Sequence, residues 1–301
     1  MQKNILIIGG TGFLGYHLAK KCLKKKWNVT SISTNKPKKI RFLPKVKYII
    51  LDITKKKLLL KKIKSNYDYV VNFGGYVNHN EKLKTYKSHY LGCKNLADLF
   101  SNKNIKSFIQ IGSSVEYGNI KSPQNENDKT NIKKLKSTYG KAKLTATNYL
   151  LALNKKYNFP CTILRLYLVY GPHQDNNRLI PYVLNECQND NTFHCSAGTQ
   201  YRDFLFVEDL IKAIFKCFNN NKSIGEIINV GSGKPRNIKK VILFIKNKIN
   251  LGSPIFGKIS LRRDEILRLY PKITKAKKIL NWKPYTSFEK GIQTIIRYHK
   301  I

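Results

Sequence analysis

Acidic residues are scarce in this sequence. Its 301 residues include 17 Asp and Glu against 57 Lys and Arg, which gives a formal net charge of +40. An excess of this size first suggests nucleic acid or an anionic membrane as a partner. Arginine is scarce as well, although it is the side chain that favours bidentate contacts to phosphates and bases, and the lysines spread along the whole chain. We therefore expect no nucleic-acid partner and interpret most of the charge as a compositional drift toward Lys.

Long hydrophobic runs and paired cysteines are also missing. No stretch of about 18 apolar residues occurs, so we expect no transmembrane segment. The N-terminus leads straight into a predicted strand, without the pattern of a signal peptide. The six cysteines form no C-x-x-C pair and no set with zinc-ligand spacing. These absences predict free thiols, a cytoplasmic location and no metal, while a hydrophobic content of 42% is ample for a packed core.

The chain does contain a regular alternation of short apolar runs and helical patterns. The apolar runs cover residues 5–8, 29–32, 47–51, 69–73, 105–111 and 161–166, and a helical pattern covers residues 13–26. Runs that are apolar on both faces indicate a parallel sheet covered by helices. The alternation predicts an α/β fold, a Rossmann-type doubly wound parallel sheet.

The second half of the sequence is less regular. Helical patterns there cover residues 180–189, 207–219 and 238–249, and turn residues cluster between them. We expect a dinucleotide-binding domain over residues 1–170, with a return near 200–231. Residues 171–301 are expected to form a smaller C-terminal α+β substrate-binding domain.

A glycine-rich segment, Gly9-Gly10-Thr11-Gly12-Phe13-Leu14-Gly15, follows the first predicted strand and opens the first predicted helix. Glycines let the backbone approach a pyrophosphate closely, and the start of a helix favours its negative charge. A glycine motif alone is weak evidence, because it can also form a tight turn without a ligand. Its strand–turn–helix context predicts dinucleotide binding.

The second predicted strand does not end in an acid. In NAD-binding Rossmann units this strand usually ends in Asp or Glu, which accepts a hydrogen bond from the adenosine 2′-hydroxyl. Here no carboxylate repels a 2′-phosphate, and Ser33, Thr34 and Lys36 can bind one. The sequence therefore favours NADPH, with NADH or NAD as the second choice. Asp52 is placed to contact the adenine, or else to cap a helix that starts near Thr54.

The pattern Tyr-x-x-x-Lys places a phenol and an ammonium group on one helix face. The ammonium group favours the phenolate, so such a tyrosine can exchange a proton with a sugar oxygen. The pattern occurs four times, close to what the Tyr and Lys content gives by chance, at Tyr16/Lys20, Tyr90/Lys94, Tyr117/Lys121 and Tyr139/Lys143. Context selects Tyr139, which starts a predicted helix downstream of a buried strand that ends in Ser113 and Ser114. Ordinary turn hydroxyls are the alternative interpretation of these two serines.

At this point the sequence resembles the extended short-chain dehydrogenases/reductases of the nucleotide-sugar epimerase/dehydratase group. The resemblance covers essentially the whole chain, and its motifs occur in the expected order. They are Gly9–Gly15, Ser113-Ser114-x-x-Tyr117-Gly118, Tyr139-x-x-x-Lys143, Arg165-x-x-x-x-Tyr170-Gly171-Pro172, Tyr201-Arg202-Asp203-Phe204, Asn229-Val230-Gly231-Ser232-Gly233 and Leu280-Asn281-Trp282-Lys283-Pro284.

The resemblance implies three groups of site residues. The catalytic residues would be Ser113, Tyr139 and Lys143. The cofactor would contact Gly9, Thr11, Gly12, Phe13, Leu14, Gly15, Ser33, Thr34, Lys36, Asp52, Ile53, Asn72, Phe73, Gly74, Tyr139 and Lys143. The substrate, a dTDP- or CDP-linked sugar, would contact His79, Ser113, Ser114, Tyr139, Arg178, Arg202, Arg262 and Arg263, so that residues 171–301 would form the nucleotide-sugar-binding domain. A homodimer is implied through helices near residues 83–102 and 139–153.

Departures from the family pattern narrow the expected reaction. Family dehydratases carry Thr-Asp-Glu where this chain reads Ser113-Ser114-Val115, and decarboxylases carry Glu at the position of Val115. Glu116 is one residue further on and should point elsewhere. Leu168 replaces an Asn that is usual in epimerases, which puts one diphosphate or sugar contact in doubt. A C4 ketoreductase or a C4 epimerase remains.

The acid-free end of the second strand favours the reductase, because a reductase consumes NADPH whereas an epimerase usually retains NAD. We therefore expect NADPH-dependent reduction of the C4 ketone of a nucleotide-linked 4-keto-6-deoxyhexose. The best match is dTDP-4-dehydro-6-deoxy-D-glucose to dTDP-D-fucose, a step in deoxysugar synthesis for surface polysaccharide such as the O-antigen of lipopolysaccharide. The alternatives are an NAD-dependent 4-epimerase, a non-catalytic nucleotide- or RNA-binding scaffold, and an enzyme that associates with membranes through its lysines.

Overall fold

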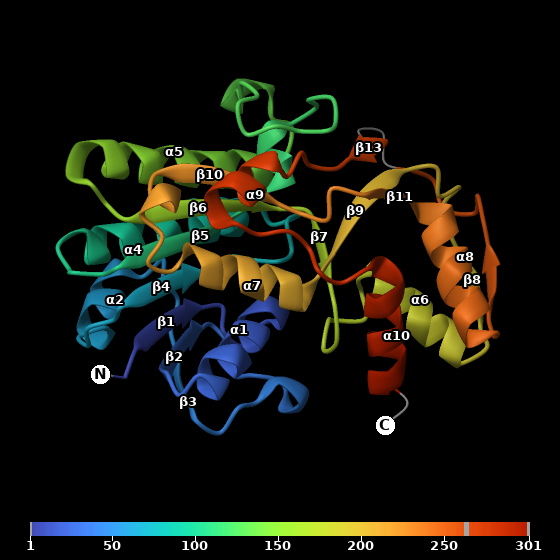
Figure 1. Ribbon diagram of the computed structural model, residues 1–301, viewed down its shortest axis with the longest axis horizontal. Helices are drawn as coiled ribbons and strands as arrows, with labels where there is room; N and C mark the ends of the chain where they lie inside the picture. The colour runs from blue at the N-terminus through green and yellow to red at the C-terminus, as the bar shows by residue number, and fades with distance from the viewer. Residues whose placement is uncertain (1, 262–264, 300–301) are drawn as a thin grey trace.

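Seven parallel strands form the central sheet of the computed structural model, which describes residues 2–261 and 265–299 (Figure 1). Their spatial order is β10-β6-β5-β4-β1-β2-β3. The strands are β1 (Asn4–Ile8), β2 (Asn28–Ser33), β3 (Val46–Ile50), β4 (Tyr69–Asn72), β5 (Ser107–Ser113), β6 (Cys161–Leu166) and β10 (Glu226–Val230). The order reverses direction between β1 and β4, where a doubly wound sheet opens a crevice at its carboxyl edge. The predicted fold class is confirmed.

Helices cover both faces of this sheet. One face packs against α1 (Phe13–Lys24), α7 (Val207–Cys217) and α9 (Thr274–Leu280). The other packs against α2 (Lys56–Lys62), α4 (Gly92–Ser101) and α5 (Thr138–Tyr157). In β1, Ile5 and Ile7 face the first layer while Leu6 and Ile8 face the second, all of them buried. Burial on both faces explains why this strand has a continuous apolar sequence.

A smaller body of short strands and helices lies beside the carboxyl edge of the sheet, at the right of Figure 1. A four-stranded sheet combines β9 (Tyr201–Phe206) with β7 (Leu168–Tyr170), β11 (Pro235–Asn237) and β13 (Arg268–Leu269), and a second sheet pairs β8 (Thr192–His194) with β12 (Ser253–Ile255). The helices are α6 (Leu179–Gln188), α8 (Ile238–Ile249) and α10 (Phe288–His299). They share a separate hydrophobic core with β9. The three helices expected in the second half are thus present, α6 and α8 here and α7 on the main sheet.

Short helical segments connect these elements. They are the 3-10 turns η1 (Lys39–Arg41), η3 (Ser114–Tyr117), η4 (Ile132–Lys134) and η5 (Asn221–Ser223), the short helix α3 (Lys82–Tyr86) and the π-helical turn η2 (Lys87–Leu91). One expected boundary is wrong. Helix α2 begins at Lys56 rather than near Thr54, and Asp52 accepts a hydrogen bond from Thr54 N (2.9 Å) in the turn before it. Asp52 therefore stabilises that turn and does not cap the helix.

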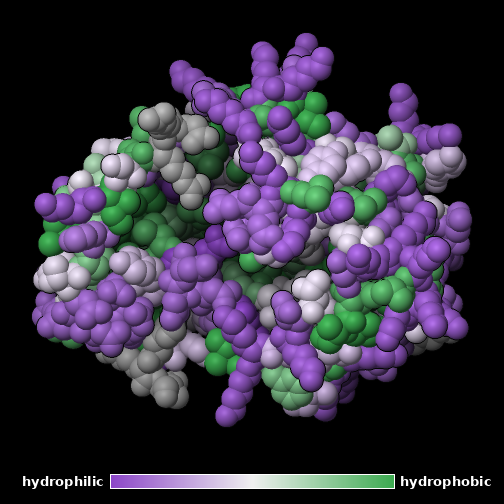
Figure 2. Space-filling view, turned by 180° about the vertical axis from the view of Figure 1, so that it is seen from behind, coloured by the Kyte–Doolittle hydropathy of each residue, from purple (hydrophilic) through white to green (hydrophobic). Residues whose placement is uncertain are grey.

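The six cysteines are all free and buried, as core packing predicts. Within the described ranges, no helix is long and apolar enough to span a membrane, and no cluster of His, Cys, Asp or Glu could hold a metal ion. Figure 2 shows hydrophilic side chains over most of one face of the molecule, with hydrophobic side chains in separate patches. Hydrophilic residues are thus spread over this face.

Candidate active site

The glycine-rich segment forms a tight turn between β1 and α1. Gly9 has a φ of +77°, and its N–H donates to Ile32 O of β2 (2.7 Å). Gly15 packs so closely on this turn that a Cβ there would lie 2.3 Å from Gly9 O. Gly12 is the N-cap of α1, and no side chain caps the helix. The uncapped N–H groups and the close backbone approach fit the pyrophosphate of a dinucleotide.

The residues predicted to bind the adenosine part of the cofactor lie at the end of β2, next to this turn. Ser33, the last residue of β2, accepts a hydrogen bond through Oγ from Thr11 N (3.3 Å). Thr34 and Lys36 are exposed just beyond it. A buried tether lies further on, where Arg41 donates to Asp175 Oδ2 (3.1 Å) in the loop before α6. The loop after β2 is therefore exposed at Thr34 and Lys36, where a ribose phosphate would lie. Its other end is fixed by the hydrogen bond between Arg41 and Asp175.

The end of β4 borders the turn on its other side, and the segment after β3 packs near it. Gly9 approaches Phe73 closely, since a Cβ there would lie 3.2 Å from the Phe73 carbonyl carbon. Asn72 uses its amide within the chain, because its Oδ1 accepts from Gly74 N (2.9 Å) and its Nδ2 donates to Gln110 Oε1 (2.8 Å). Ile53 is buried in the core, which leaves only its backbone near an adenine. Of these predicted cofactor residues, Asn72 and Ile53 shape the wall of the crevice with side chains that are already occupied.

Ser113 ends β5 and caps the following turn, η3. Its Oγ accepts from Val115 N (3.4 Å), and its N–H donates to Glu116 Oε1 (2.8 Å), which together form a capping box. Glu116 is buried, and its Oε2 accepts from Arg165 Nε of β6 (3.0 Å) and from Thr147 Oγ1 of α5 (2.8 Å). The expectation that Glu116 points away from the catalytic edge is confirmed, and the buried ion pair fixes the backbone of Ser113.

Tyr139 and Lys143 lie in the first turns of α5, next to η3. Ser137 is the N-cap of this helix, and its Oγ accepts from Gly140 N (3.0 Å). Lys143 is buried, and its Nζ donates to Ile111 O of β5 (2.6 Å) and lies 5.8 Å from the Tyr139 ring centroid. Hydrogen bonding to the strand that ends in Ser113 brings the ammonium group to the carboxyl edge of the sheet. The three predicted catalytic residues therefore come from two elements that pack directly on each other.

Two histidines enclose the ring of Tyr139. His79, in the loop after β4, stacks on it with 4.0 Å between centroids and an interplanar angle of 12°. His89 of η2 meets the ring edge-on at 4.8 Å. Partial burial and the positive charges of Arg178 and Lys143 lower the pKa of His79, so its ring is neutral near pH 7. The structure thus brings one predicted substrate residue, His79, onto the ring of Tyr139, and the charge of a second, Arg178, acts on His79.

The other predicted substrate arginines lie in the smaller body or beyond the described ranges. Arg202 of β9 pairs with Glu265, and its Nη1 donates to Tyr201 O (2.9 Å). A substrate diphosphate would have to compete with Glu265 for this guanidinium group. Arg262 and Arg263 lie outside the described residues.

Sequence reasoning missed His89 and the partners of Glu116. The His89 ring lies directly against Gly75. A Cβ at Gly75 would overlap the His89 ring at 1.8 Å. No local pattern pairs Glu116 with Arg165, because the two residues meet only when β5 and β6 are adjacent.

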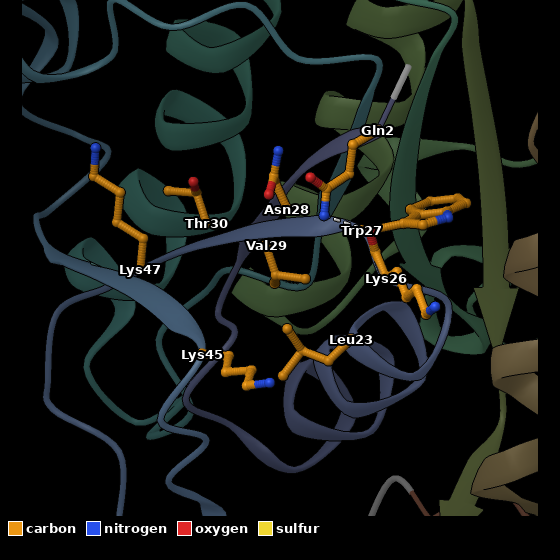
Figure 3. A pocket seen from close by; sticks show the side chains of 9 residues that line it. All are labelled: Gln2, Leu23, Lys26, Trp27, Asn28, Val29, Thr30, Lys45 and Lys47. Carbon is orange, nitrogen blue, oxygen red and sulfur yellow. Dashed lines mark hydrogen bonds between the residues drawn. The ribbon is translucent and has the colours of Figure 1, made fainter.

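A hollow at the opposite edge of the sheet is not part of this site. It lies at the start of β2, between Trp27 and the lysines Lys26, Lys45 and Lys47 (Figure 3). The side chains that line it come from the end of α1 and from the amino ends of β1, β2 and β3, whereas ligands of doubly wound sheets bind at the carboxyl ends. We therefore assign the active site to the crevice beside Gly9, Ser113 and Tyr139.

Known proteins resemble this chain in sequence and in fold. The model of the NAD dependent epimerase/dehydratase family matches residues 5–231. A Methanocaldococcus jannaschii protein named "Putative UDP-glucose 4-epimerase" is 28% identical over 98% of this chain and 98% of its own length. CDP-abequose synthase of Salmonella muenchen is 26% identical over 98% of both chains. A crystal structure of UDP-glucose 4-epimerase with UDP-glucose, from Thermotoga maritima, has a TM-score of 0.92 at 22% identity and covers 99% of this chain and 98% of that one.

Proposed function

The chain belongs to the NAD dependent epimerase/dehydratase family, and from that premise we propose that it reduces the C4 ketone of a nucleotide-linked 4-keto-6-deoxyhexose with NADPH. The best candidate reaction is dTDP-4-dehydro-6-deoxy-D-glucose to dTDP-D-fucose, and a CDP-linked sugar is the second. Such a product would serve in deoxysugar and surface-polysaccharide synthesis.

The observation that carries this proposal is the end of β2. Ser33 occupies the last position of the strand, where an acid would select NAD, and its Oγ already faces the glycine turn at Thr11. The exposed Thr34 and Lys36 leave room and charge for a 2′-phosphate. A cofactor with this 2′-phosphate, NADPH, suits a reductase, because a reductase binds a new cofactor molecule in every turnover.

The strand end at β5 supports ketoreduction over elimination or decarboxylation. Elimination and decarboxylation need a carboxylate beside the sugar. In this chain Ser114 and Val115 occupy the positions at which the family's dehydratases and decarboxylases have acids. Glu116 is held in the core by Arg165 and Thr147. The likeness to CDP-abequose synthase supports a reductase of a CDP- or dTDP-linked sugar.

In the proposed mechanism, Tyr139 donates its proton to the oxygen that forms at C4. Ser113 holds the same oxygen by a hydrogen bond, and the capping box keeps its backbone fixed. Lys143 keeps a positive charge near the phenol, which favours the phenolate left after proton transfer. Arg178 and His79 border the sugar, and Arg202 binds the diphosphate once Glu265 releases it.

The nicotinamide cofactor would lie along the carboxyl edge, with its pyrophosphate on the start of α1 between Gly12 and Gly15. When bound, it supplies the hydride at C4. Lys143 would bind the nicotinamide ribose with an N–H group that Ile111 leaves free. We propose that residues 1–170, with the return through β10, form the cofactor-binding domain, and that residues 171–301 contribute the sugar-binding side.

A turnover assay with a panel of substrates tests the proposal. Purified protein is mixed with NADPH or NADH and with dTDP- or CDP-linked 4-keto-6-deoxy sugars, and absorbance at 340 nm is followed. We expect stoichiometric oxidation of NADPH and a product with a hydroxyl group at C4. If no keto sugar oxidises NADPH or NADH, the proposal is wrong.

A 4-epimerase is the second candidate, favoured by the likeness to the Methanocaldococcus jannaschii relative. It would exchange the C4 epimers of a UDP-sugar without net oxidation of the cofactor. Chromatography of UDP-glucose incubated with protein and NAD distinguishes the two functions, because an epimerase yields UDP-galactose and a ketoreductase leaves UDP-glucose unchanged.

We also propose that the protein is a cytoplasmic homodimer. Free, buried thiols suit a reducing compartment. Leu83 and Tyr86, in the segment expected to pair, are 66% and 37% exposed. Sedimentation at two protein concentrations tests for the dimer. A monomer at both concentrations would contradict this proposal.

A further inference from the structure

A buried imidazole lies behind Tyr139. His89 belongs to η2 and is 6% exposed, and its ring meets the Tyr139 ring at an interplanar angle of 70°. Gly75 leaves room for it, with a φ of +154° and no space for a Cβ. The loop after β4 is therefore shaped around this histidine, which neither the motifs nor the proposed mechanism uses.

The hydrogen bond of His89 shows which ring nitrogen carries the proton. Nε2 lies 3.2 Å from Tyr76 O, and because a carbonyl only accepts, Nε2 is the protonated nitrogen. Burial, and then the charge of Lys143, lower the pKa of His89 to about 2, so the ring stays neutral. Nδ1 is thus a lone-pair acceptor, and it is buried without a hydrogen-bond partner in the described part of the chain. A buried acceptor costs free energy until a donor reaches it.

Lys143 has the complementary need. Its ammonium group carries three N–H donors and is 4% exposed, and Ile111 O takes one of them. A buried charge requires further acceptors. The charge of Lys143 acts on His89 and on Cys93, which lie one turn apart on the continuous helical segment η2–α4. The Lys143 Nζ and the His89 ring centroid lie 5.8 and 4.8 Å from the Tyr139 ring centroid, so both groups adjoin this ring.

The titratable groups around His89 come from three elements. Tyr139 and Lys143 belong to α5, His79 to the loop after β4, and Cys93, whose pKa burial raises to about 12, to α4. At neutral pH, Lys143 is the charged member of this set. Among the described residues of this set, His89 Nδ1 is a buried acceptor without a hydrogen-bond donor.

We propose that His89 is a positioning residue that holds the Lys143 ammonium group beside Tyr139. Nδ1 has no direct hydrogen bond among the described residues, and it would accept one of the N–H groups that Ile111 leaves free through one water molecule. With Ile111 O and His89 Nδ1 fixing two donors, the third is aimed at the nicotinamide ribose. The inference rests on the proposed catalytic roles of Tyr139 and Lys143, and it explains how a flexible lysine side chain keeps one orientation.

Three variants test this role. His89→Phe keeps a planar ring and removes the acceptor, His89→Asn keeps an acceptor oxygen, and His194→Asn, on the remote strand β8, is the matched control. The readout needs no substrate. The Tyr139 phenolate is titrated by ultraviolet difference spectroscopy, and Tyr139→Phe identifies its contribution to the signal.

We expect His89→Phe to move the Tyr139 titration upward by about one pH unit, because a less firmly held ammonium group stabilises the phenolate less. His89→Asn should shift it by less than half as much, and His194→Asn should leave it unchanged. Once a substrate is known, His89→Phe should lower kcat about tenfold with little change in KM.

An unchanged titration in folded His89→Phe protein overturns the proposal. If circular dichroism shows that this variant does not fold, His89→Met, which is flexible and apolar, replaces it with the same expected shift. Because the titration uses no sugar, a protein without ketoreductase activity still gives a decisive result for His89. The two proposals can therefore fail separately.

Discussion

Tyr139 is the residue on which the proposed proton transfer depends. Replacing it with Phe removes the hydroxyl group and keeps the ring between His79 and His89. We expect Tyr139→Phe to lower kcat about 100-fold or more, with NADPH affinity within a few-fold of wild type. Stopped-flow kinetics and fluorescence titration measure the two quantities. Tyr90→Phe, at another Tyr-x-x-x-Lys match, is the control and should retain full turnover. If Tyr139→Phe turns over as fast as wild type, Tyr139 is not the proton donor.

Ser33 determines the expected cofactor preference. Ser33→Asp would place a carboxylate where the 2′-phosphate binds, and like charges repel. We expect kcat/KM for NADPH to fall at least tenfold and kcat/KM for NADH to rise, while Ser33→Ala keeps the preference for NADPH. The measurement is the ratio of kcat/KM for the two cofactors. A wild-type ratio in the Asp variant would contradict the placement of the phosphate.

His17 makes stability depend on acidity. It packs against Phe13 and Tyr16, and its Nε2 lies 2.8 Å from Pro172 O. Burial lowers the pKa of His17 to about 4, from an ordinary value of 6.5. The unfolded chain therefore binds a proton that the folded protein does not, and stability is lost as the pH falls from 6.5 toward 4.

The loss from His17 should reach at most about 3 kcal/mol, since each unit of difference in pKa is worth about 1.4 kcal/mol. Urea unfolding at pH 7.5, 6 and 5 measures it. His17→Gln should show a shallower dependence on pH than wild type. Parallel curves for the two proteins would assign the acid sensitivity to other groups.

Motifs identified the residues whose chemistry depends on local order along the chain. Gly9 to Gly15, Ser113, and the pair Tyr139/Lys143 lie at strand and helix ends that the sequence alone predicted. Their partners could not be predicted, because Arg165 reaches Glu116 and Glu265 reaches Arg202 only through contacts between distant segments. Spacing alone did not select Tyr139 either, since Tyr117 has the same spacing and is buried with its hydroxyl on Asn229.

At the scale of elements, the joint between β5, β6 and α5 depends on Glu116. One buried carboxylate connects the Ser113 backbone, Arg165 and Thr147. Glu116→Gln keeps the shape and removes the charge, which leaves the Arg165 guanidinium group without a counter-ion in the core. Breaking a buried ion pair in this way costs about 3 kcal/mol or more.

We therefore expect the free energy of unfolding of Glu116→Gln, measured in urea, to fall by that amount. Turnover should fall too, because a neutral Gln oxygen holds the Ser113 backbone less firmly than the Glu116 carboxylate does. The control Glu226→Gln breaks the partly exposed pair with Lys275 and should cost about 1 kcal/mol or less. Equal losses of unfolding free energy in both variants would show that burial does not make the Glu116 ion pair more important for stability.

Periodicity predicted six strands of the main sheet and the helices α1, α6, α7 and α8 within a few residues, and it missed the short elements and the 12-residue helix α10. The strands of the main sheet are buried on both faces, so their apolar runs stand out. Strands such as β7 and β13 have three and two residues, too few for an alternation to appear. The π-helical turn η2, which carries His89, has the same residue types as an ordinary helix. Its geometry comes from tertiary packing.

At the scale of the whole molecule, the charge of +40 is a property of the surface rather than of one site. A positive surface raises the local concentration of anionic ligands, and salt screens this effect. We expect kcat/KM for the nucleotide sugar to fall several-fold between about 20 and 300 mM NaCl, with kcat unchanged. Steady-state kinetics at constant pH measure it. A kcat/KM that is independent of salt would leave the charge without a role in capture.

The position of β10 in the sheet has a consequence for synthesis in the cell. β10 pairs with β6, although the chain enters α6 and β9 between the two strands. While the nascent chain is still shorter than about residue 230, β6 is an open edge whose hydrogen-bonding groups face water or a neighbouring polypeptide. Translation must pass β7, α6, β8 and β9 of the smaller body before the seven-stranded sheet is closed. The seven-stranded sheet can therefore be completed only after β10 has left the ribosome.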